Sequence, residues 1–321
     1  MTKQFVNELK KDDSVDSYFA VVEKEPVKKY AKGYSVSLKI SDKTGVIIAK
    51  FWGGNDQSVV EQVFSSFDIQ NVVQIKGTVG EWNGKLEFAI NPDSGGTITK
   101  TDSYDIVDLV PTTKKDIEKM KEDLQNIIGQ ISDSDIKRLL KSFFDDGEFL
   151  KQFAKSPAAM TRHHNFIGGL LEHILSLIDI SKNIVKIHSK LNIDLLIAGC
   201  IFHDIGKIKE YESGLVGIGY TTDGRLFGHI NIGYTMVSEK IEKLKPFDEI
   251  IAKKILHMIL SHHGQLDWGS PVEPAFPEAI ALHYIDQVDA KIKGVLQEIE
   301  KFGITEDWSG WVKDYGRLFL K

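Results

Sequence analysis

The spacing of apolar residues changes near Pro111, and this change divides the chain into two parts of different fold class. Before it, runs such as Val36–Ile40 and Val72–Lys76 alternate apolar and polar residues, which is typical of half-buried strands. After it, apolar residues such as Ile117 and Met120 recur at steps of three and four, which is typical of amphipathic helices. A chain of 321 residues is long enough for two domains. We therefore expect a β domain followed by an all-α domain.

The β part predicts a small β-barrel of the OB-fold type. About five strands are expected near residues 17–24, 33–41, 45–52, 72–81 and 85–90, separated by turn signals such as Asn83-Gly84. A short helix is expected over residues 58–67, between the third and fourth strands. Five short strands with one helix after the third is the order of an OB-fold, a Greek-key barrel. Another small β-barrel or a sandwich is the alternative.

A linker and a helical bundle are predicted for the rest of the chain. Residues 91–110 are rich in Asp, Ser, Gly and Thr, which indicates a linker and a domain boundary. Helices are then expected from Thr112 onward and near 133–144, 147–155, 164–188, 192–207, 229–244, 247–263 and 275–301. Residues 211–227 predict a hairpin or lid loop. We place the OB-fold in 1–105, the linker and leading helices in 106–160, a helical domain in 161–305 and a C-terminal tail in 306–321.

Composition limits where the protein works and what it binds. The net charge is −6, from 40 Lys and Arg against 46 Asp and Glu, so any nucleic-acid binding must come from a local patch. No apolar run reaches the roughly 18 residues of a membrane span, and the first residues lack the apolar stretch of a signal peptide. The single cysteine, Cys200, cannot form an intrachain disulfide. We therefore expect a cytoplasmic protein with no membrane partner.

All ten histidines lie in the helical part of the chain, after residue 162. Five features each fall on a different expected helix, where each could supply ligands to one centre. They are His173, the pair His203-Asp204, His229, the pair His262-His263, and Asp286.

Helical geometry predicts that several of these side chains point inward. At 100° per residue, His173 shares a face with Leu177, and His203 shares a face with Leu196. Asp204 follows an almost wholly apolar helix, where a carboxylate is costly to bury unless it is paired or bound to a metal. A single inward histidine is more often a hydrogen-bonded core residue than a ligand. Five such features on five helices favour a common centre over coincidence.

The mixture of ligand types predicts a divalent metal site. Imidazoles and carboxylates without a thiolate exclude a structural zinc site of the cysteine type. The set exceeds three ligands, so a six-coordinate ion or two ions bridged by Asp204 fits better than a three-ligand catalytic zinc site. Mn²⁺ is the first choice, and Co²⁺, Fe and Mg²⁺ are alternatives. The candidate ligands are His173, His203, Asp204, His229, His262 and Asp286, with His263 as a further candidate.

Three stretches carry a resemblance to a known family. Phe202–Lys207 resembles the HDxGK core of the HD phosphohydrolase superfamily. Two further stretches, His163–His173 and Leu282–Lys291, make the resemblance more specific. With an OB-type module in front, the chain is similar to the YhaM-type 3′→5′ exoribonucleases of Gram-positive bacteria. The resemblance implies that residues 161–305 are an HD phosphohydrolase domain. The tail from Asp307 departs from the expected family pattern, so nothing is carried over to it.

The resemblance implies metal-dependent hydrolysis of single-stranded RNA, and of single-stranded DNA as a further candidate substrate, from the 3′ end. Nucleoside 5′-monophosphates are the implied products. A bound metal would lower the pKa of a water from 15.7 toward ~7. Asp204 and Lys207 are the candidate catalytic residues, with the lysine stabilising charge on the phosphoryl group, unless it is only a solvated lysine at a helix end. Arg162, His164 and Arg225 are weaker candidates for phosphate contact, and each could equally be a surface residue.

The OB module is expected to bind the single-stranded RNA. Such folds stack bases on aromatic side chains beside a cationic groove. The candidate contacts are Phe51, Trp52, Trp82, Lys28, Lys29 and Lys32. Strand parity alone does not tell which aromatic residues belong to the core.

Two other functions compete with the exoribonuclease. One is an HD hydrolase of small nucleotides, although a mononucleotide needs no strand-binding platform. The other is a single-strand-binding accessory protein with a vestigial site, although the ligand set is complete. A homo-oligomer is compatible with each of these functions.

Overall fold

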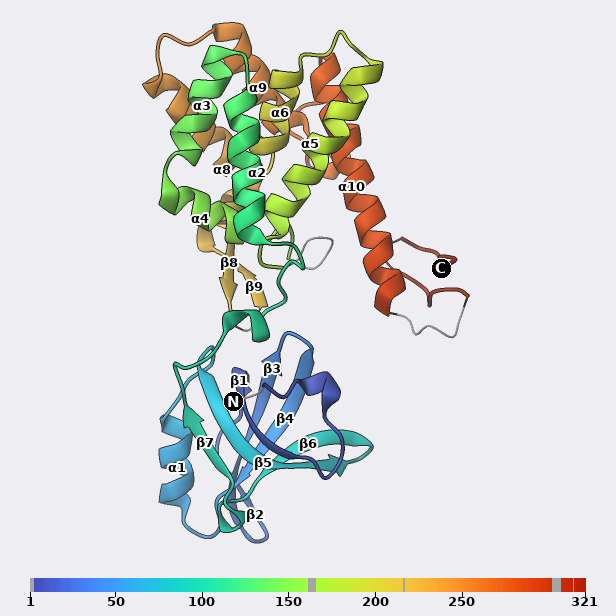
Figure 1. The fold of residues 1–321 in the computed structure, drawn as a ribbon. Coiled ribbons are helices and arrows are strands. Elements are labelled where there is room, and N and C mark those ends of the chain that lie inside the picture. The colour runs from blue at the N-terminus through green and yellow to red at the C-terminus, as the bar shows by residue number, and fades with distance from the viewer. Residues whose placement is uncertain (1–2, 161–165, 216, 302–306, 314) are drawn as a thin grey trace. The chain divides into compact units, whose positions relative to one another are not determined.

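The computed structural model describes residues 3–160, 166–215, 217–301, 307–313 and 315–321 (Figure 1). The chain divides into two compact units. The first comprises Met1–Pro111 with Gly214–Gly217, and the second comprises Thr112–Ser213 with Ile218–Lys321. No helix among the described residues is long and apolar enough to cross a membrane.

The first unit is built around one mixed sheet. Its strands are β1 (Ser14–Lys24), β2 (Lys28–Tyr30), β3 (Gly33–Asp42), β4 (Gly45–Trp52), β5 (Val72–Trp82), β6 (Lys85–Ile90) and β7 (Thr97–Lys100). The strand order is β1-β3-β4-β6-β5-β7, and β5 also pairs with β1, so the five long strands form a closed ring. Helix α1 (Gln57–Ser65) follows β4, the third strand of that ring. This order confirms the predicted OB-fold.

Local sequence explains the two hairpins of the ring. At the β3–β4 turn, Asp42 Oδ1 accepts hydrogen bonds from the backbone N of Thr44 at 2.8 Å and from its hydroxyl at 2.6 Å. At the β5–β6 turn, Asn83 and Gly84 have φ values of 50° and 74°. Two consecutive positive φ values favour the Asn-Gly pair and match the twist of the paired strands.

Two short strands were not predicted. β2 pairs with β3, and β7 pairs with β5. β7 lies within residues 91–110, so the expectation that this whole segment is a linker is wrong. Its Thr-Ile-Thr-Lys sequence is too short for a clear period, and pairing with β5 places Ile98 in the core at 6 % exposure.

Alternating residues of the ring fill the core of the first unit. On β4, Ile47, Ala49 and Phe51 point inward and are at most 6 % exposed. Phe51 is 4 % exposed and packs in the core, so the expectation that it contacts nucleic acid is wrong. Trp52, the next residue on the strand, lies on the opposite face because side chains alternate along a strand.

The second unit is a helical bundle with one small hairpin, which confirms the all-α expectation. Its helices are α2 (Ile117–Gln130), α3 (Ser134–Phe144), α4 (Gly147–Lys155), α5 (Gly169–Ile187), α6 (Ile193–Phe202), α7 (Lys207–Glu210), α8 (Thr222–Lys243), α9 (Glu249–Ser261) and α10 (Pro277–Lys301). Five of them begin at an Asp or Asn whose side chain accepts a backbone N–H of the first turn, which is the preferred N-cap chemistry. These caps are Asp116, Asp133, Asp146, Asn192 and Asp248.

The predicted loop over residues 211–227 is a hairpin for only part of its length. Strands β8 (Tyr211–Gly214) and β9 (Gly217–Tyr220) form the hairpin, but α8 begins at Thr222. The Thr221 hydroxyl caps the helix by accepting from the backbone N of Gly224 at 2.9 Å. Gly228, with φ 69° and ψ 157°, then kinks α8 immediately before His229. Glycine and threonine hid this helical turn from sequence analysis because both are weak helix formers.

Helix α6 is the centre of the bundle. Residues 195–202 are all buried, and the helix packs against α3, α5, α9 and α10. A helix that is apolar all round is buried on every side. The residues that follow its last turn, His203 and Asp204, are therefore carried into the interior.

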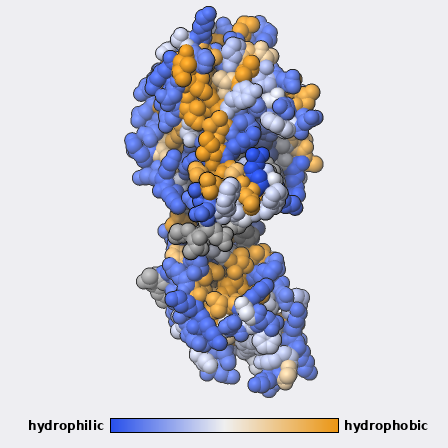
Figure 2. Space-filling model, turned by 90° about the vertical axis from the view of Figure 1, so that its right-hand side faces the viewer, coloured by the Kyte–Doolittle hydropathy of each residue, from blue (hydrophilic) through white to orange (hydrophobic). Residues whose placement is uncertain are grey.

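Helix α10 carries an exposed apolar stripe along its outer side. The stripe falls at every fourth position, and each of its side chains is at least 46 % exposed: Ile280, Tyr284, Val288, Ile292 and Leu296. Figure 2 shows one face of the molecule, on which apolar surface gathers over the helical unit. Surfaces of this kind contact other polypeptides more often than isolated apolar side chains do.

Candidate metal centre

The structure brings the predicted histidines and aspartates together from α5, α8 and α10 and from the residues that directly follow α6 and α9. The nitrogen and oxygen ligand atoms of His173, His203 and Asp204 lie within 4.8 Å of one another. The ring nitrogens of His229, His262 and His263 form a second group of the same size. Asp286 joins the first group, with its Oδ1 at 3.2 Å from His173 Nε2.

Asp204 lies between the two groups. Its Oδ2 is 3.2 Å from His203 Nε2 and 2.6 Å from Lys207 Nζ. Its Oδ1 is 3.5 Å from His229 Nε2 and 3.7 Å from His262 Nε2. A carboxylate with one oxygen toward each group can bridge two ions.

Close backbone packing allows this arrangement. Gly206 follows the His203-Asp204 pair, and a Cβ atom at Gly206 would lie 2.0 Å from the carbonyl oxygen of His229. Any side chain at this position would therefore push α8 and His229 away from Asp204. The glycine of the HDxGK motif thus has a packing role in this chain.

The tautomer of each imidazole is set by a partner that can only accept a hydrogen bond. The Nδ1 atoms donate to the Asp289 carboxylate (His173, 2.8 Å), Cys200 O (His203, 2.9 Å), the Glu210 carboxylate (His229, 3.1 Å), Ile259 O (His262, 2.7 Å) and Trp268 O (His263, 3.0 Å). A neutral imidazole that donates through Nδ1 has its lone pair on Nε2. This arrangement is typical of metal-binding histidines.

Several of these inward atoms are buried without a hydrogen-bond partner. Among the described residues, they include Nε2 of His203, His229 and His262, and Oδ1 of Asp204. An unsatisfied buried polar atom costs about 1–3 kcal/mol. One or two cations between them would satisfy all four atoms. The residues present therefore fit a divalent metal.

Electrostatic interactions and burial keep Asp204 and His262 in the protonation states that bind a cation. Burial alone would raise the pKa of Asp204, but Lys207 and His203 hold it well below its usual value. Burial and the neighbouring histidines lower the pKa of His262 well below its usual value. The ionised carboxylate of Asp204 and the neutral imidazole of His262 are the forms that bind metals. His173 differs, because Asp286 and Asp289 outweigh burial and raise its pKa to about 9, so it carries a proton that a metal ion would have to displace.

Sequence reasoning missed two carboxylates, Glu210 and Asp289. Glu210 Oε1 accepts from the backbone N of His229 at 3.0 Å and from its Nδ1 at 3.1 Å. Asp289 is 5 % exposed and accepts from His173 Nδ1. Asp289 lies one helical turn after Asp286, and residues three apart share a helix face. This spacing from Asp286 could have identified Asp289 in the sequence, whereas no sequence pattern pointed to Glu210.

The remaining predicted contacts of the helical unit have different surroundings. The Lys207 side chain is 13 % exposed and reaches Asp204, so it is not a solvated lysine at a helix end. Arg225 is exposed and lies over the Tyr220 ring, with 5.6 Å between its guanidinium carbon and the ring centroid. Arg162 and His164 lie outside the described residues. Cys200 is buried, which raises the pKa of its thiol to about 12 and leaves it protonated.

The predicted contacts of the OB-fold lie at separate places on its surface. Lys28, Ser35 and Trp52 are cross-strand partners on β2, β3 and β4, so Lys28 and Trp52 share a face of the sheet. Lys28 forms an ion pair with Glu25 at 2.7 Å, and Trp52 packs edge-on against Tyr30 with ring centroids 4.8 Å apart. Trp82 is 65 % exposed at the β5–β6 turn. Lys29 and Lys32 are exposed.

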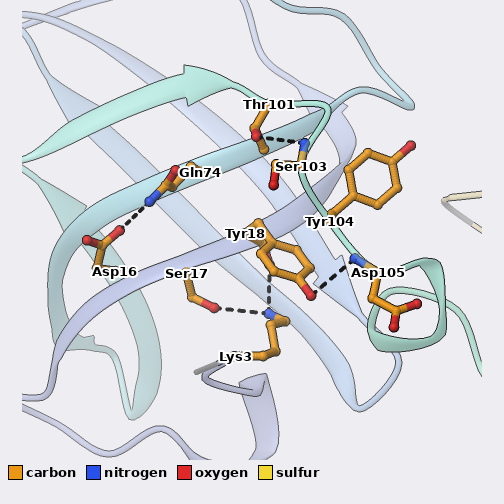
Figure 3. A pocket seen from close by; sticks show the side chains of 9 residues that line it. All are labelled: Lys3, Asp16, Ser17, Tyr18, Gln74, Thr101, Ser103, Tyr104 and Asp105. Atoms are coloured by element: carbon orange, nitrogen blue, oxygen red, sulfur yellow. Dashed lines mark hydrogen bonds between the residues drawn. The ribbon is translucent and has the colours of Figure 1, made fainter. Parts of the chain in front are cut away.

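The OB-fold also has a polar cavity of about 590 Å³, lined by residues of β1, β5 and the segment after β7 (Figure 3). Its polar groups bond mainly to one another. Lys3 Nζ donates to the carbonyl of Tyr18 at 2.6 Å, and Gln74 Nε2 donates to Asp16 at 2.7 Å. Its lining has charges of both signs, since Lys3 lies there together with Asp16 and Asp105.

Comparisons with known proteins agree with this geometry. The HD domain model matches residues 170–291, which contain all the candidate ligands. The chain is 35 % identical to the 3′-5′ exoribonuclease YhaM of Geobacillus sp. (strain WCH70), over 83 % of this chain and 79 % of that protein. It is 32 % identical to YhaM of Bacillus subtilis (strain 168), over 83 % of this chain and 81 % of that protein.

A solved domain of replication protein A from Methanococcus maripaludis covers 31 % of this chain and 98 % of its own, with 23 % identity and a TM-score of 0.25. The two YhaM relatives and the HD domain match carry the assignment. The chain therefore belongs to the family of the 3′-5′ exoribonuclease YhaM, and its helical unit contains the HD domain of a hydrolase.

Proposed function

We propose that this protein is a metal-dependent 3′→5′ exoribonuclease that hydrolyses single-stranded RNA. The observation that carries the proposal is the group of four buried ligand atoms, from His203, Asp204, His229 and His262, that converge without hydrogen-bond partners among the described residues. Water attack on the last phosphodiester breaks the P–O3′ bond and releases a nucleoside 5′-monophosphate. This reaction does not use the 2′-hydroxyl, so single-stranded DNA is a chemically competent second substrate.

The predicted ligand set would hold the metal in this scheme. It comprises His173, His203, Asp204, His229, His262 and Asp286, with His263 as a further candidate. A bound divalent ion supplies a water of lowered pKa and positive charge for the phosphate oxygens. Mn²⁺ is the first choice because imidazole and carboxylate oxygen together suit it, with Co²⁺, Fe and Mg²⁺ as alternatives.

The chain's own residues would position the substrate and stabilise the charge that develops on it. Lys207 Nζ, 2.6 Å from Asp204 Oδ2, places a fixed positive charge beside the centre. Such a preorganised cation stabilises the developing charge of the phosphoryl group. Asp289 and Glu210 would hold His173 and His229 with Nε2 toward the centre.

The direct test uses single-stranded RNA labelled at its 5′ end, with Mn²⁺ added. The proposal predicts a ladder of stepwise shortened products together with nucleoside 5′-monophosphates. Cleavage of mononucleotides alone would instead support a small-nucleotide hydrolase, and binding without turnover would support an accessory protein. The same assay with single-stranded DNA measures the preference between the two nucleic acids.

Asp289 offers a test of the metal centre that does not depend on activity. Asp289→Ala is expected to weaken metal binding about 10–100-fold, because His173 loses the partner that orients its ring. Calorimetric titration with Mn²⁺ measures the affinity. Asp289→Asn, whose amide oxygen still accepts from Nδ1, should recover much of it. Asp179→Ala, an exposed carboxylate on the same helix as His173, is the control, and equal losses in both alanine variants would contradict the assignment.

We propose that the OB-fold, residues 1–105, holds the single strand for an HD domain in 161–305, with 106–160 as linker and leading helices and 306–321 as tail. Lys28 and Trp52 share a sheet face that combines a cation with an aromatic ring. The stripe on α10 supports a homo-oligomer, and the buried thiol of Cys200 is compatible with a cytoplasmic protein.

The OB-fold proposal predicts a dependence on substrate length. Trp52→Ala should raise KM for long RNA about 5–150-fold, since stacking on an aromatic ring is worth ~1–3 kcal/mol per base. Hydrolysis of a dinucleotide should hardly change, because it has too few nucleotides to occupy both the metal centre and a second binding site. Steady-state kinetics on both substrates measures this, with Trp311→Ala in the helical unit as the control. Equal losses on both substrates would mean that Trp52 is structural.

A further inference from the structure

The loop that follows His262 and His263 presents a tryptophan beside the metal centre. Residues 262–276 connect α9 to α10, and within them Leu266–Trp268 form a 3-10 turn. The backbone N of Trp268 donates to Gln265 O at 3.0 Å, and its carbonyl accepts from His263 Nδ1 at 3.0 Å. The Ser270 hydroxyl donates to Leu260 O at 3.0 Å, which ties the loop to α9. Trp268 therefore has a fixed backbone one hydrogen bond away from a candidate ligand.

The indole lies near two side chains and still remains about half exposed. Its ring lies 6.0 Å from the His283 ring, with 36° between the planes, and Lys291 Nζ is 5.9 Å from its centroid. His283 is 7 % exposed, and its Nδ1 donates to His262 O at 2.8 Å. Trp268 nevertheless remains 48 % exposed.

The same loop also fixes the position of His283, the residue whose ring lies near the Trp268 indole. A Cβ atom at Gly264 would lie 2.2 Å from His283 Cε1, so only a glycine leaves room for the ring. Gly264 also has φ +82°, which side chains rarely adopt. The loop therefore keeps a supported aromatic surface in place next to the metal centre instead of burying the indole in the core.

We propose that Trp268 is a stacking site for a nucleobase of the single-stranded substrate near the scissile phosphate. The inference rests on the proposed function. Stacking accepts any base because every base has a π face, which suits an enzyme that removes nucleotides one after another. The Lys291 ammonium, over the ring at 5.9 Å from its centroid, adds a positive charge that would attract the phosphate of the stacked nucleotide. Continuity with the metal centre, together with this cation, favours a nucleotide over a second copy of the chain.

The test compares Trp268→Ala with Trp308→Ala on short single-stranded RNAs that carry one abasic residue at successive positions from the 3′ end. Trp308 is 53 % exposed in the same unit and is the matched control. In the wild type, loss of one base near the 3′ end should lower kcat/KM about 5–100-fold. On intact RNA, Trp268→Ala should show a decrease in kcat/KM of the same size. Its kcat/KM should not fall further when the base at that position is absent. Trp268→Tyr should retain most of the activity.

Three results would overturn the proposal. They are unchanged kcat/KM in Trp268→Ala, an equal loss on intact and abasic RNA, and dissociation of an oligomer with abasic sensitivity retained. The second result would mean that the loop only supports His263, and Mn²⁺ affinity measured by calorimetry would then fall as well. The third would mean that the indole contacts another copy.

A binding assay separates failure of this inference from failure of the proposed function. Fluorescence anisotropy with labelled RNA and a chelator measures affinity without hydrolysis. If the wild type binds RNA through Trp268 but never shortens it, the result contradicts the proposed function and supports the stacking site. If it shortens RNA without dependence on Trp268 in either assay, only the stacking site falls.

Discussion

Replacement of Asp204 by asparagine is expected to lower the rate of RNA hydrolysis by at least about 1000-fold. The Asp204 carboxylate lies near three imidazoles and the Lys207 ammonium. Because it contacts residues of both ligand groups, its negative charge can act on both. Metal-ion catalysis contributes several kcal/mol, and each 1.36 kcal/mol is tenfold in rate. Asparagine has nearly the same size but no charge, so loss of the negative charge is isolated from loss of volume. Rates on 5′-labelled RNA at saturating Mn²⁺ measure the effect.

The variant must be folded for this result to count. Asp204→Asn should keep the circular dichroism spectrum of the wild type, because α6 is held by its apolar residues and not by the carboxylate. Asp179→Asn, a 75 % exposed side chain on α5, should retain full activity. Wild-type turnover in folded Asp204→Asn would mean that the His-Asp pair is not the centre of the reaction.

Removal of divalent metal is expected to stop hydrolysis and to lower the melting temperature of the helical unit. A ligand that binds only the native state stabilises it by about 2.7 kcal/mol at 100 times its Kd. For a unit of about 200 residues this corresponds to a shift of roughly 5–10 °C. The physical reason is that, without a cation, His203, Asp204, His229 and His262 keep buried atoms that have no hydrogen-bond partner in the described part of the chain. Calorimetry before and after chelation, and again with Mn²⁺ restored, measures the shift.

Asp204→Asn supplies the control for the metal experiment. Its melting temperature should respond to Mn²⁺ much less than that of the wild type, since the shared ligand has lost its charge. An equal response in both proteins would place the stabilising ion elsewhere. Full activity of chelated wild type would contradict metal dependence altogether.

Periodicity and the order of chemical groups were enough to predict the architecture. The change from a period of two to steps of three and four separated the OB-fold from the helical unit, because each period reflects how a single element buries one face. Five of the six candidate ligands could be selected because they are polar residues on otherwise apolar helices, where burial without a function is costly. His229 was selected by its place in the spacing of the set along the chain. The structure brings all six into one region of the helical unit.

Other features could not be predicted because they depend on contacts between distant segments. Phe51 and Trp52 are neighbours of similar chemistry, and only the closure of the ring decides that Phe51 is core while Trp52 lies on the outer face. The start of α8 was missed because a capping threonine and a kink at Gly228 replace the usual apolar period. Glu210 contacts His229 across a hairpin, and local spacing carries no trace of that contact.

The sequence by itself determined which groups are available for chemistry, since residue type and helical phase are properties of each segment alone. Only the tertiary structure decided how those groups are used. Packing of α6 inside the bundle places Asp204 between the two sets of imidazoles. Acceptors from distant segments orient the His173 and His229 rings with Nε2 inward, and the loop after α9 leaves Trp268 half exposed. Hydrogen bonds and packing between segments far apart in the chain have no local signature, so they emerge only when the whole chain is folded.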